Sequence, residues 1–561
     1  MMKKTVLSAF LFIFLFSVAS SSGCNGSASM LVPAVIGDGS GMVNLSVRVV
    51  PGSGDVFIST TPQTGISTQI SAEDAAVYAF SKSGNKDCDA IVKIDSAGSA
   101  GYVDGPSAGA ALAVLTYGAL EGIEPRTDAV MTGSVDEFGN IGIVGGLYEK
   151  SMAAVAINAH YFIIPKANMF DILLLKGVKE KYGVEVLEAT EADEAIGFML
   201  YNKSLSPATI EREPEKLPDL EKYDIEGLAG FGNVTLRMLD AVNRSVQGLP
   251  GEDNDSAIIK SYYRARQENN QELYDKGYLY AAANEAFLDQ VEISTIQAVL
   301  SGDVDLEKEK DSVESCLSNL KETQKTDANF EYVLGAELRE QWALEKLNST
   351  DITEPVLQEE KYVVYNELAY ADAWCDVSGV LMDTAGSDGN AINESAWKSL
   401  AEAKIREAQE VENAGSQETE HLASALVSYS EGKYGAAIFD AVWVVEMAQV
   451  DSELSDMLVA DLDSNVSSML AQNRTSLWGN VYQSQGAYLA QTSSNSSAFR
   501  ILRLAKGLDN VTDSMREAAG ISQKPESGGS TPEYQCLVFS IFLITIVLLF
   551  YISIRLSRKG R

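Results

Sequence analysis

Two short segments of the sequence contain residue types that could hydrolyse an amide bond. GYVDGPSAG carries Ser107 between glycines, and GGLYEKSMAA carries Lys150 among small and apolar residues. A serine hydroxyl is a poor nucleophile near neutral pH and needs a neighbouring group to take its proton. The two histidines, His160 and His421, are too few and too poorly placed to build a histidine-based triad, whereas lysine is an established alternative base. We therefore predict that Ser107 is a nucleophile and Lys150 its general base.

A lysine can act as a base only when its amine is neutral. The pKa of the amine must then fall from about 10.4, through desolvation, cationic neighbours or both. Gly146, Leu147 and Met152 are small or apolar residues that could surround Lys150 on a helix. Glu149 should point elsewhere on that helix, because a carboxylate beside the amine would stabilise its charged form.

The residues around Ser107 favour close backbone approach and binding of negative charge. Gly105 and Gly109 leave room for a bound peptide. A helix is expected to begin at Pro106, where the missing amide proton of proline costs nothing, so Ser107 lies in its first turn. Free amides there suit an oxyanion, an effect worth about 10²–10³ in rate per donor. Asp104 is expected to cap this helix, a structural role that we favour over a direct catalytic one.

Together these segments resemble the proteolytic domain of Lon proteases, in particular the archaeal membrane-bound branch. DGPSAG matches the family's serine segment, GGLYEKSMAA matches its lysine segment, and the forty-three-residue separation of Ser107 and Lys150 equals the family spacing. In the MTG stretch between them, Thr132 matches a family residue that hydrogen-bonds the lysine. The resemblance covers residues 30–200 and implies a Lon-type α+β fold and polypeptide substrates. Because Lon-type domains commonly form hexameric rings, it also implies a homo-oligomer.

Lon proteases usually carry an ATPase module, which needs a phosphate loop of the form GxxxxGK followed by serine or threonine. The sequence contains no such loop, and its nearest GK pair, Gly432 and Lys433, is followed by Tyr434. We therefore predict ATP-independent cleavage of unfolded or extended polypeptides, without a cofactor.

The elements that must position these residues alternate between strands and helices, which predicts an α/β or α+β domain over residues 30–200. Ser71 is expected to start a helix, because acidic residues follow it near the positive end of the helix dipole. Further helices are expected at residues 106–120 and 147–158. Strands are expected at residues 43–50, 55–60, 90–94 and 161–164.

The rest of the chain changes character after residue 200. Residues 204–224, with three prolines and many charges, are predicted to be a linker or domain-joining arm. Residues 225–520 are predicted to be mainly α-helical. Within them, YDKGYLYAAANEAFLDQV from Tyr274 and YSEGKYGAAIFDAVWVVEMA from Tyr429 echo each other, as in helical-hairpin repeats of the tetratricopeptide kind. No further copies stand out, so we favour a plain helical bundle over a repeat array. This bundle could select substrates, assemble the protein or act as a stalk.

Both ends of the chain predict export and membrane attachment. Residues 1–24 have the basic start, apolar stretch and small residues of a secretory signal peptide. Residues 536–554 are uncharged and nearly as long as the roughly 20 residues of a transmembrane helix. A flexible tether at 521–533 precedes that helix. The basic tail at 555–561 should be cytoplasmic, which places the bulk of the chain outside the cell membrane.

Composition narrows the partners further. The chain has 561 residues, 43 Lys and Arg against 79 Asp and Glu, and a net charge of −36. This charge would repel phosphate backbones, so nucleic acid is a poor candidate partner. Frequent Asn-X-Ser/Thr sequons agree with an exported glycoprotein. Cys316 and Cys375 could form a disulfide or remain two buried thiols, lipidation of Cys24 stays open, and no cysteine pattern indicates a metal site.

These observations support three functional hypotheses. The leading one is an ATP-independent, membrane-anchored, extracytoplasmic serine endopeptidase that works through an acyl-enzyme intermediate. The main alternative is a non-catalytic, Lon-like envelope scaffold that binds peptides. A third is a surface protein that cuts only its own chain.

Overall fold

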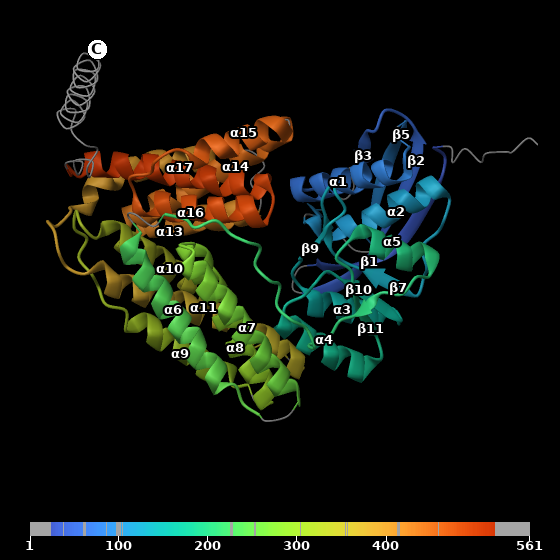
Figure 1. Cartoon of the computed structure of the whole chain (residues 1–561), viewed down its shortest axis with the longest axis horizontal. Helices are drawn as coiled ribbons and strands as arrows, with labels where there is room; N and C mark the ends of the chain where they lie inside the picture. The colour runs from blue at the N-terminus through green and yellow to red at the C-terminus, as the bar shows by residue number, and fades with distance from the viewer. Residues whose placement is uncertain are drawn as a thin grey trace, which may run out of the picture.

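The chain folds into an α/β amino-terminal domain and a helical domain that lie beside each other (Figure 1). The computed structural model describes residues 24–521, apart from 37–38, 60–62, 86, 97–101, 104, 225–227, 252–253, 303, 354, 356, 412–415 and 458. The predicted signal peptide up to residue 23, nearly all of the tether, the predicted membrane helix at 536–554 and the basic tail lie outside the described residues. Within them, no helix has both the length and the apolar character needed to cross a membrane.

Two four-stranded sheets form the framework of the amino-terminal domain. The first has the order β1-β2-β5-β3, with β2 antiparallel to both β1 and β5 and with β3 parallel to β5. Its strands are β1 (Ser27–Ile36), β2 (Gly39–Pro51), β5 (Cys88–Ser96) and β3 (Val56–Ile58). The second has the order β12-β11-β10-β7, with β12 (Ser206–Pro207), β11 (Glu185–Glu188), β10 (Tyr161–Ile164) and β7 (Ala129–Met131). All four predicted strands are therefore confirmed.

Short strand pairs and five helices complete this domain. The pairs are β4 (Gln63–Thr64) with β6 (Tyr102–Val103), and β8 (Ser134–Val135) with β9 (Ile141–Gly142). The helices are α1 (Ile66–Ser83), α2 (Gly109–Glu121), α3 (Leu147–Ala156), α4 (Met169–Tyr182) and α5 (Ala192–Tyr201). The predicted helix at 106–120 consists of a 3₁₀ turn, η1 (Pro106–Ala108), that continues into α2. Because α2 is apolar nearly all round, it is buried, and it packs against α1, β1 and β2.

The prediction that a helix starts at Ser71 is wrong. Helix α1 begins five residues earlier, at Ile66, after an N-cap at Gly65. Ser71 is buried inside the helix, where its hydroxyl donates a hydrogen bond of 3.0 Å to the main-chain oxygen of Pro106. A serine before acidic residues is a local N-cap signal, and here a tertiary contact uses the same hydroxyl.

Residues 204–224 run from one domain onto the other along a path fixed by contacts. Near the start of the segment, β12 pairs with β11, and Arg212 forms a 2.8 Å ion pair with Glu188. Near its end, Leu220 is buried and its main-chain oxygen accepts a 2.7 Å hydrogen bond from the amine of Lys276, the residue after α7. This arm therefore packs against both domains.

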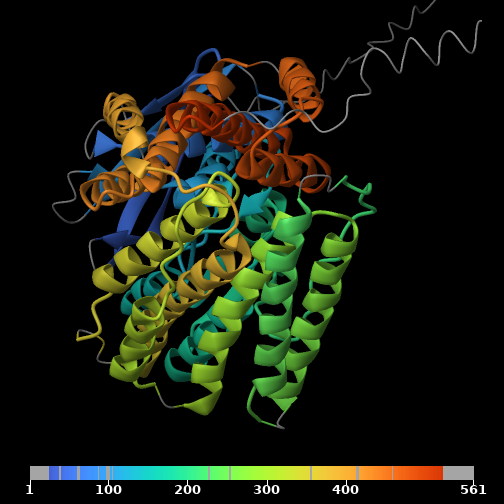
Figure 2. The same cartoon turned by 90° about the vertical axis from the view of Figure 1, so that its left-hand side faces the viewer.

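The helical domain consists of two groups of helices. Figure 2 shows the green and yellow helices side by side beneath the orange and red ones. The first group comprises α6 (Ala229–Gly248), α7 (Asn254–Asp275), α8 (Leu279–Ser301), α9 (Leu306–Ser318), α10 (Phe330–Ser349) and α11 (Gln358–Ala385). The second comprises α12 (Lys398–Gln409), α13 (Ser416–Ser430), α14 (Tyr434–Asp456), α15 (Val459–Leu470), α16 (Leu477–Thr492) and α17 (Asn495–Ala518), with η2 (Glu394–Trp397) before α12.

The two echoing segments both form the tight corner of a helical hairpin. Gly277 joins α7 to α8 with φ 91°, and Gly432 joins α13 to α14 with φ 84°, a conformation that glycine adopts without strain. At matching distances from these corners, Arg266 pairs with Glu285 (2.9 Å) in the first hairpin. His421 contacts Asp440 (2.8 Å) in the second. The sequence echo therefore corresponds to two hairpins of the same construction, one in each group of helices.

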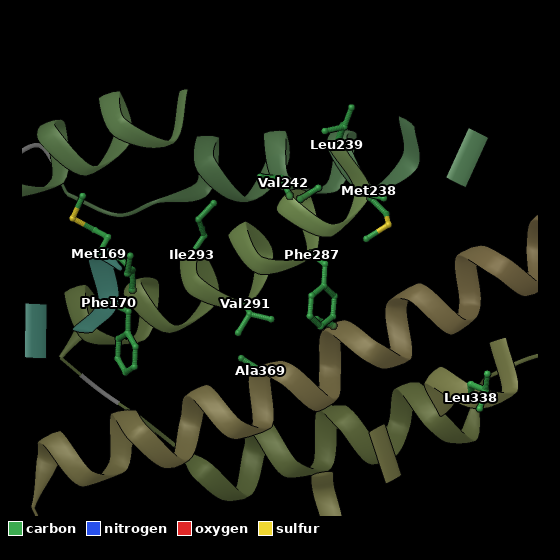
Figure 3. Packing of buried hydrophobic residues seen from close by; sticks show 14 of the residues in the cluster. Met169, Phe170, Met238, Leu239, Val242, Phe287, Val291, Ile293, Leu338 and Ala369 are labelled. Atoms are coloured by element: carbon green, nitrogen blue, oxygen red, sulfur yellow. The ribbon is translucent and has the colours of Figure 1, made fainter. Parts of the chain in front are cut away.

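The two domains share a hydrophobic core. One cluster of buried side chains extends from α3 and α4 into α6, α8, α10 and α11. Figure 3 shows Met169 and Phe170 of α4 close to Ile293 of α8. Glu292 of α8 also accepts hydrogen bonds from the Met169 and Phe170 amides at the start of α4, at 2.5 and 3.0 Å. The helical domain thus caps a helix of the amino-terminal domain.

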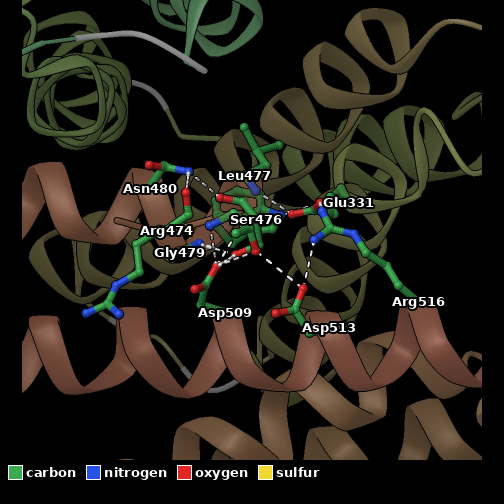
Figure 4. A network of polar contacts seen from close by, with 11 residues as sticks. Glu331, Arg474, Ser476, Leu477, Gly479, Asn480, Asp509, Asp513 and Arg516 are labelled. Carbon is green, nitrogen blue, oxygen red and sulfur yellow. Dashed lines mark hydrogen bonds and ion pairs between the residues drawn. The ribbon is translucent and has the colours of Figure 1, made fainter. Parts of the chain in front are cut away.

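A buried polar network joins helices that are distant in sequence (Figure 4). Asp509 of α17 accepts hydrogen bonds from the amide and hydroxyl of Ser476, the N-cap of α16, both at 2.8 Å. Glu331 of α10 accepts from the Leu477 amide at 2.5 Å and from the Arg516 guanidinium at 2.6 Å. Because buried carboxylates are stable only with such partners, this network fixes how α10, α16 and α17 meet.

Two disulfides cross-link the chain. Cys316 of α9 is bonded to Cys375 of α11, which decides between the two alternatives left open by the sequence. Cys24 is bonded to Cys88 of β5, so its sulfur is not available for a lipid thioether in this structure.

Candidate active site

Ser107 lies in the 3₁₀ turn η1, half-buried, between Gly105 and helix α2. Gly105 has φ 124°, a conformation that residues with a side chain rarely adopt, so this glycine sets the direction of the chain into the turn. The main-chain oxygen of Ser107 accepts a 3.0 Å hydrogen bond from the Gly133 amide. The first amides of a helix have no partner inside it, so those of this turn suit the oxyanion role predicted for them. Asp104, the predicted cap, lies outside the described residues.

Thr132 ties the turn to the end of β7. Its side chain is only 1% exposed, and its hydroxyl donates to the main-chain oxygen of Ser107 at 3.2 Å. No hydrogen bond joins Thr132 to Lys150 among the described residues. In this structure Thr132 therefore supports the backbone of the serine, whereas the resemblance implied a bond to the lysine.

Two further residues that hold the turn are Thr68 and Ser71, both on α1. Thr68 donates to the oxygen of Gly105 at 3.2 Å, and Ser71 donates to that of Pro106 at 3.0 Å. Sequence reasoning missed this function for both residues. The only local signal was a pair of hydroxyl residues in a helix, which is equally consistent with a helix start or a solvent-exposed face.

Lys150 lies in the first turn of α3 and is only 4% exposed. Burial lowers the pKa of its amine from 10.5 to about 8, and the charge of Glu149 opposes this shift. No carboxylate forms an ion pair with the amine in the part of the chain that the structure describes. The predicted desolvation of the lysine is therefore confirmed, and an amine with this pKa is partly neutral near pH 8.

The amine of Lys150 donates a hydrogen bond of 2.7 Å to the main-chain oxygen of Gly145. Gly146, between them in sequence, is the N-cap of α3 with φ 68°. A neutral amine keeps its lone pair while it donates one proton, so the Gly145 bond is compatible with a basic role. Once protonated, the ammonium is stabilised by the same oxygen.

Comparison with known proteins assigns this domain to a family. A model of the C-terminal proteolytic domain of Lon protease (S16) matches residues 26–201. Residues 26–201 are a Lon-type proteolytic domain. Ser107, Thr132 and Lys150 all lie inside this Lon domain, whereas the helical domain lies outside the matched range.

Similar proteins agree with this assignment. The Lon domain region is similar to an archaeal Lon protease of Pyrococcus abyssi, 35% identical over 116 residues, which is 21% of this chain and 11% of the relative. A Halobacterium salinarum archaeal Lon protease is 27% identical over 184 residues, covering 32% of this chain and 26% of the relative. A Chloroflexus aggregans Lon protease is 32% identical over 162 residues, covering 28% of this chain and 20% of the relative. The chain therefore spans a quarter or less of the length of most of these relatives.

Proposed function

We propose that this protein is a serine endopeptidase in which Ser107 is the nucleophile and Lys150 the general base. The observation that carries the proposal is the buried Lys150, whose pKa is lowered to about 8 inside a Lon-type proteolytic domain. The backbone turn that carries Ser107 also supports the proposal, because hydrogen bonds from Thr68, Ser71 and Thr132 hold it in place.

The proposed reaction uses the two residues in turn. The neutral Lys150 amine takes the hydroxyl proton of Ser107 as its oxygen attacks the scissile carbonyl carbon, and amides of the η1 turn stabilise the oxyanion. The tetrahedral intermediate collapses when the C–N bond breaks, and Lys150 returns its proton to the leaving amine. Water, deprotonated by the Lys150 amine, then attacks the ester carbon on Ser107. The ester C–O bond breaks, and Lys150 returns the proton to the Ser107 oxygen.

The proposed substrates are unfolded or extended polypeptides, cleaved without ATP. This proposal is supported by the sequence, which contains no phosphate loop, and by the Lon match, which covers the proteolytic domain. Hydrolysis of a peptide bond is itself downhill, so an extended substrate requires no motor. A ring-shaped homo-oligomer remains part of the proposal by resemblance to Lon-type domains.

The proposed location is the outer side of the cell membrane. The signal-like residues 1–24 and the apolar residues 536–554 followed by a basic tail support this topology. Two disulfides add support, because such bonds persist mainly in oxidising compartments. The same topology makes the sequons accessible to glycosylation.

Degradation of an unfolded protein tests the function directly. The purified chain should cleave reduced, carboxymethylated protein without ATP, and Ser107→Ala and Lys150→Ala should each abolish cleavage. Activity that survives both substitutions would refute the dyad. If instead Ser107 fails to react with a serine-directed acylating probe while the chain still binds unfolded protein, the peptide-binding scaffold replaces the peptidase.

A further inference from the structure

Arg339 of α10 is a buried cation without an acidic partner in the described part of the chain. Its side chain is 5% exposed, Nη1 donates to the main-chain oxygen of Gly335 at 3.2 Å, and Nε has no hydrogen-bond partner. Among the described residues, no carboxylate forms an ion pair with it. A guanidinium has five N–H donors, and this one does not use all of them. Burial of a charge is costly unless the charge is paired and hydrogen-bonded, so a bound anion would stabilise it.

Two other arginines of the helical domain, Arg266 and Arg516, do have acidic partners. Arg266 pairs with Glu285 at 2.9 Å, and Arg516 pairs with Glu331 at 2.6 Å. The chain carries nearly twice as many acidic as basic residues, so carboxylates are plentiful. The environment of Arg339 therefore excludes acidic side chains although the composition would readily supply one.

Aromatic rings surround the guanidinium instead. Its central carbon lies 4.6 Å from the ring centre of Trp478, 4.9 Å from that of Trp342 and 5.9 Å from that of Trp374. Ring faces attract a cation, and a planar guanidinium stacked on them still presents its N–H edge to an anion. The three tryptophans thus hold the cation without consuming its hydrogen bonds.

Arg339 lines a small cavity in the helical domain, together with Phe231, Tyr280, Asn284 and Trp374. Its volume is about 40 Å³. One water needs roughly 10–15 Å³ on this scale, so the cavity takes about three heavy atoms. A carboxylate group has this size, and the Asn284 amide lies at the cavity as a second polar group.

The cavity adjoins a larger groove. Met238 and Val377 line both the cavity and a neighbouring hollow of about 520 Å³ bordered by α6, α9 and α11. Figure 3 shows Met238 of α6 close to Phe287 of α8, another residue that lines the cavity. A chain whose end enters the cavity can therefore lie with its preceding residues in this groove.

We propose that the cavity at Arg339 binds the terminal carboxylate of an unfolded polypeptide whose last side chains are apolar, with the preceding residues in the groove. The groove offers apolar contacts at Met238, Val380 and Met382 beside charged residues of both signs. These contacts favour apolar side chains, and the net charge of −36 disfavours acidic segments, which leaves one carboxylate as the matching anion. This inference rests on the proposed function, because it names the substrate feature that the helical domain selects for the Lon domain.

Binding of matched peptides to the full chain carrying Ser107→Ala tests the proposal without cleavage. An uncharged apolar octapeptide with a blocked amino end is titrated as the free acid and as the amide, followed by tryptophan fluorescence and calorimetry. The free acid should bind at least tenfold more tightly. Equal affinity of the two peptides would overturn the proposal even if Arg339 variants fail to fold. An amidated peptide ending in glutamate should bind as weakly as the plain amide, and affinity equal to that of the free acid would refute recognition of the chain end.

Arg339→Gln should remove the difference between acid and amide. Arg406→Gln, which removes the same charge from an exposed position on α12, should leave that difference intact, and thermal unfolding shows whether both variants are folded. An Arg339→Gln chain that folds and still prefers the acid tenfold would overturn the assignment to this residue. Selective binding without proteolysis by the wild-type chain refutes only the peptidase, whereas proteolysis without selectivity refutes only the site.

Discussion

Lys150 of the Lon domain and Arg339 of the helical domain are both buried and have no carboxylate partner among the residues that the structure describes, but burial has opposite consequences for them. Lys150 is 4% exposed and Arg339 5% exposed. A lysine amine responds to burial by losing its proton, and the pKa of Lys150 falls to about 8. A guanidinium stays charged at any physiological pH. Arg339 therefore packs against tryptophan rings and can still bind an anion. Burial of a cation thus supports the proposed base in one domain and the proposed anion site in the other.

The largest effect is expected when the lysine at position 150 is replaced by arginine. Lys150→Arg keeps a positive charge that cannot be removed, so the Ser107 proton has no acceptor. We expect kcat/KM to fall by about 10³-fold, within the range for loss of a general base. Cleavage of a fluorogenic peptide measures it, with Lys166→Arg on the exposed surface as control. Retention of more than a tenth of the activity would show that Lys150 is not the base.

A second test concerns the cost of burying Lys150. Its pKa is lower in the folded chain than in the unfolded chain, so the cost is complete below pH 8 and disappears as pH rises towards 10.5. A shift from 10.5 to about 8 corresponds to roughly 3 kcal/mol. Lys150→Met should therefore increase the free energy of unfolding by about that amount at pH 6 and by less at pH 9.5.

Denaturant unfolding of the Lys150→Met chain at the two pH values measures this change. Lys166→Met replaces an exposed lysine of the same domain and should show no such pH dependence. If Lys150→Met destabilises the fold at pH 6, the buried amine contributes packing that outweighs its desolvation.

The comparison also shows which features sequence alone can predict. DGPSAG and GGLYEKSMAA are local patterns, and the strands and helices around them follow from local hydrophobic periodicity. The positions of Ser107 and Lys150 in the fold, and the burial of the lysine, could therefore be predicted. Arg339 could not, because in sequence it is one charged residue on a helix. Its lack of a partner appears only when Trp374 and Trp478 approach from other helices.

The wrong start of α1 has a similar cause. Ser71 before Glu73 and Asp74 satisfies a local capping pattern, but Gly65 ends the extended segment earlier and Ser71 bonds to the Pro106 oxygen. Disulfide pairing likewise depends on tertiary distance, so Cys24 with Cys88 was not predicted. Local signals thus gave the elements, and contacts between distant segments decided the details of the site.

Substitution of Thr132 tests whether this residue acts on the Ser107 turn alone or also on the Lys150 amine. Its hydroxyl donates to the Ser107 oxygen, so Thr132→Val should loosen the turn and lower kcat about tenfold, as loss of one buried hydrogen bond suggests. Thr132→Ser keeps the hydroxyl and should retain most of the activity. The midpoint of the pH profile should not move in either variant. A shifted midpoint would show that Thr132 acts on the Lys150 amine, as the family resemblance implied.

The smallest expected effect concerns Glu149, the charged residue that precedes Lys150 in an otherwise apolar environment. Activity should rise with pH through a midpoint near 8, because only the neutral amine accepts the Ser107 proton. The charge of Glu149 raises the pKa of Lys150, so Glu149→Gln should move that midpoint by a few tenths of a unit towards lower pH. Glu180→Gln, at an exposed position on α4, serves as the control for removal of one carboxylate from the same domain. A midpoint that stays fixed in Glu149→Gln would show that the charge of Glu149 does not affect the basicity of Lys150, and an upward shift would contradict the direction of its effect.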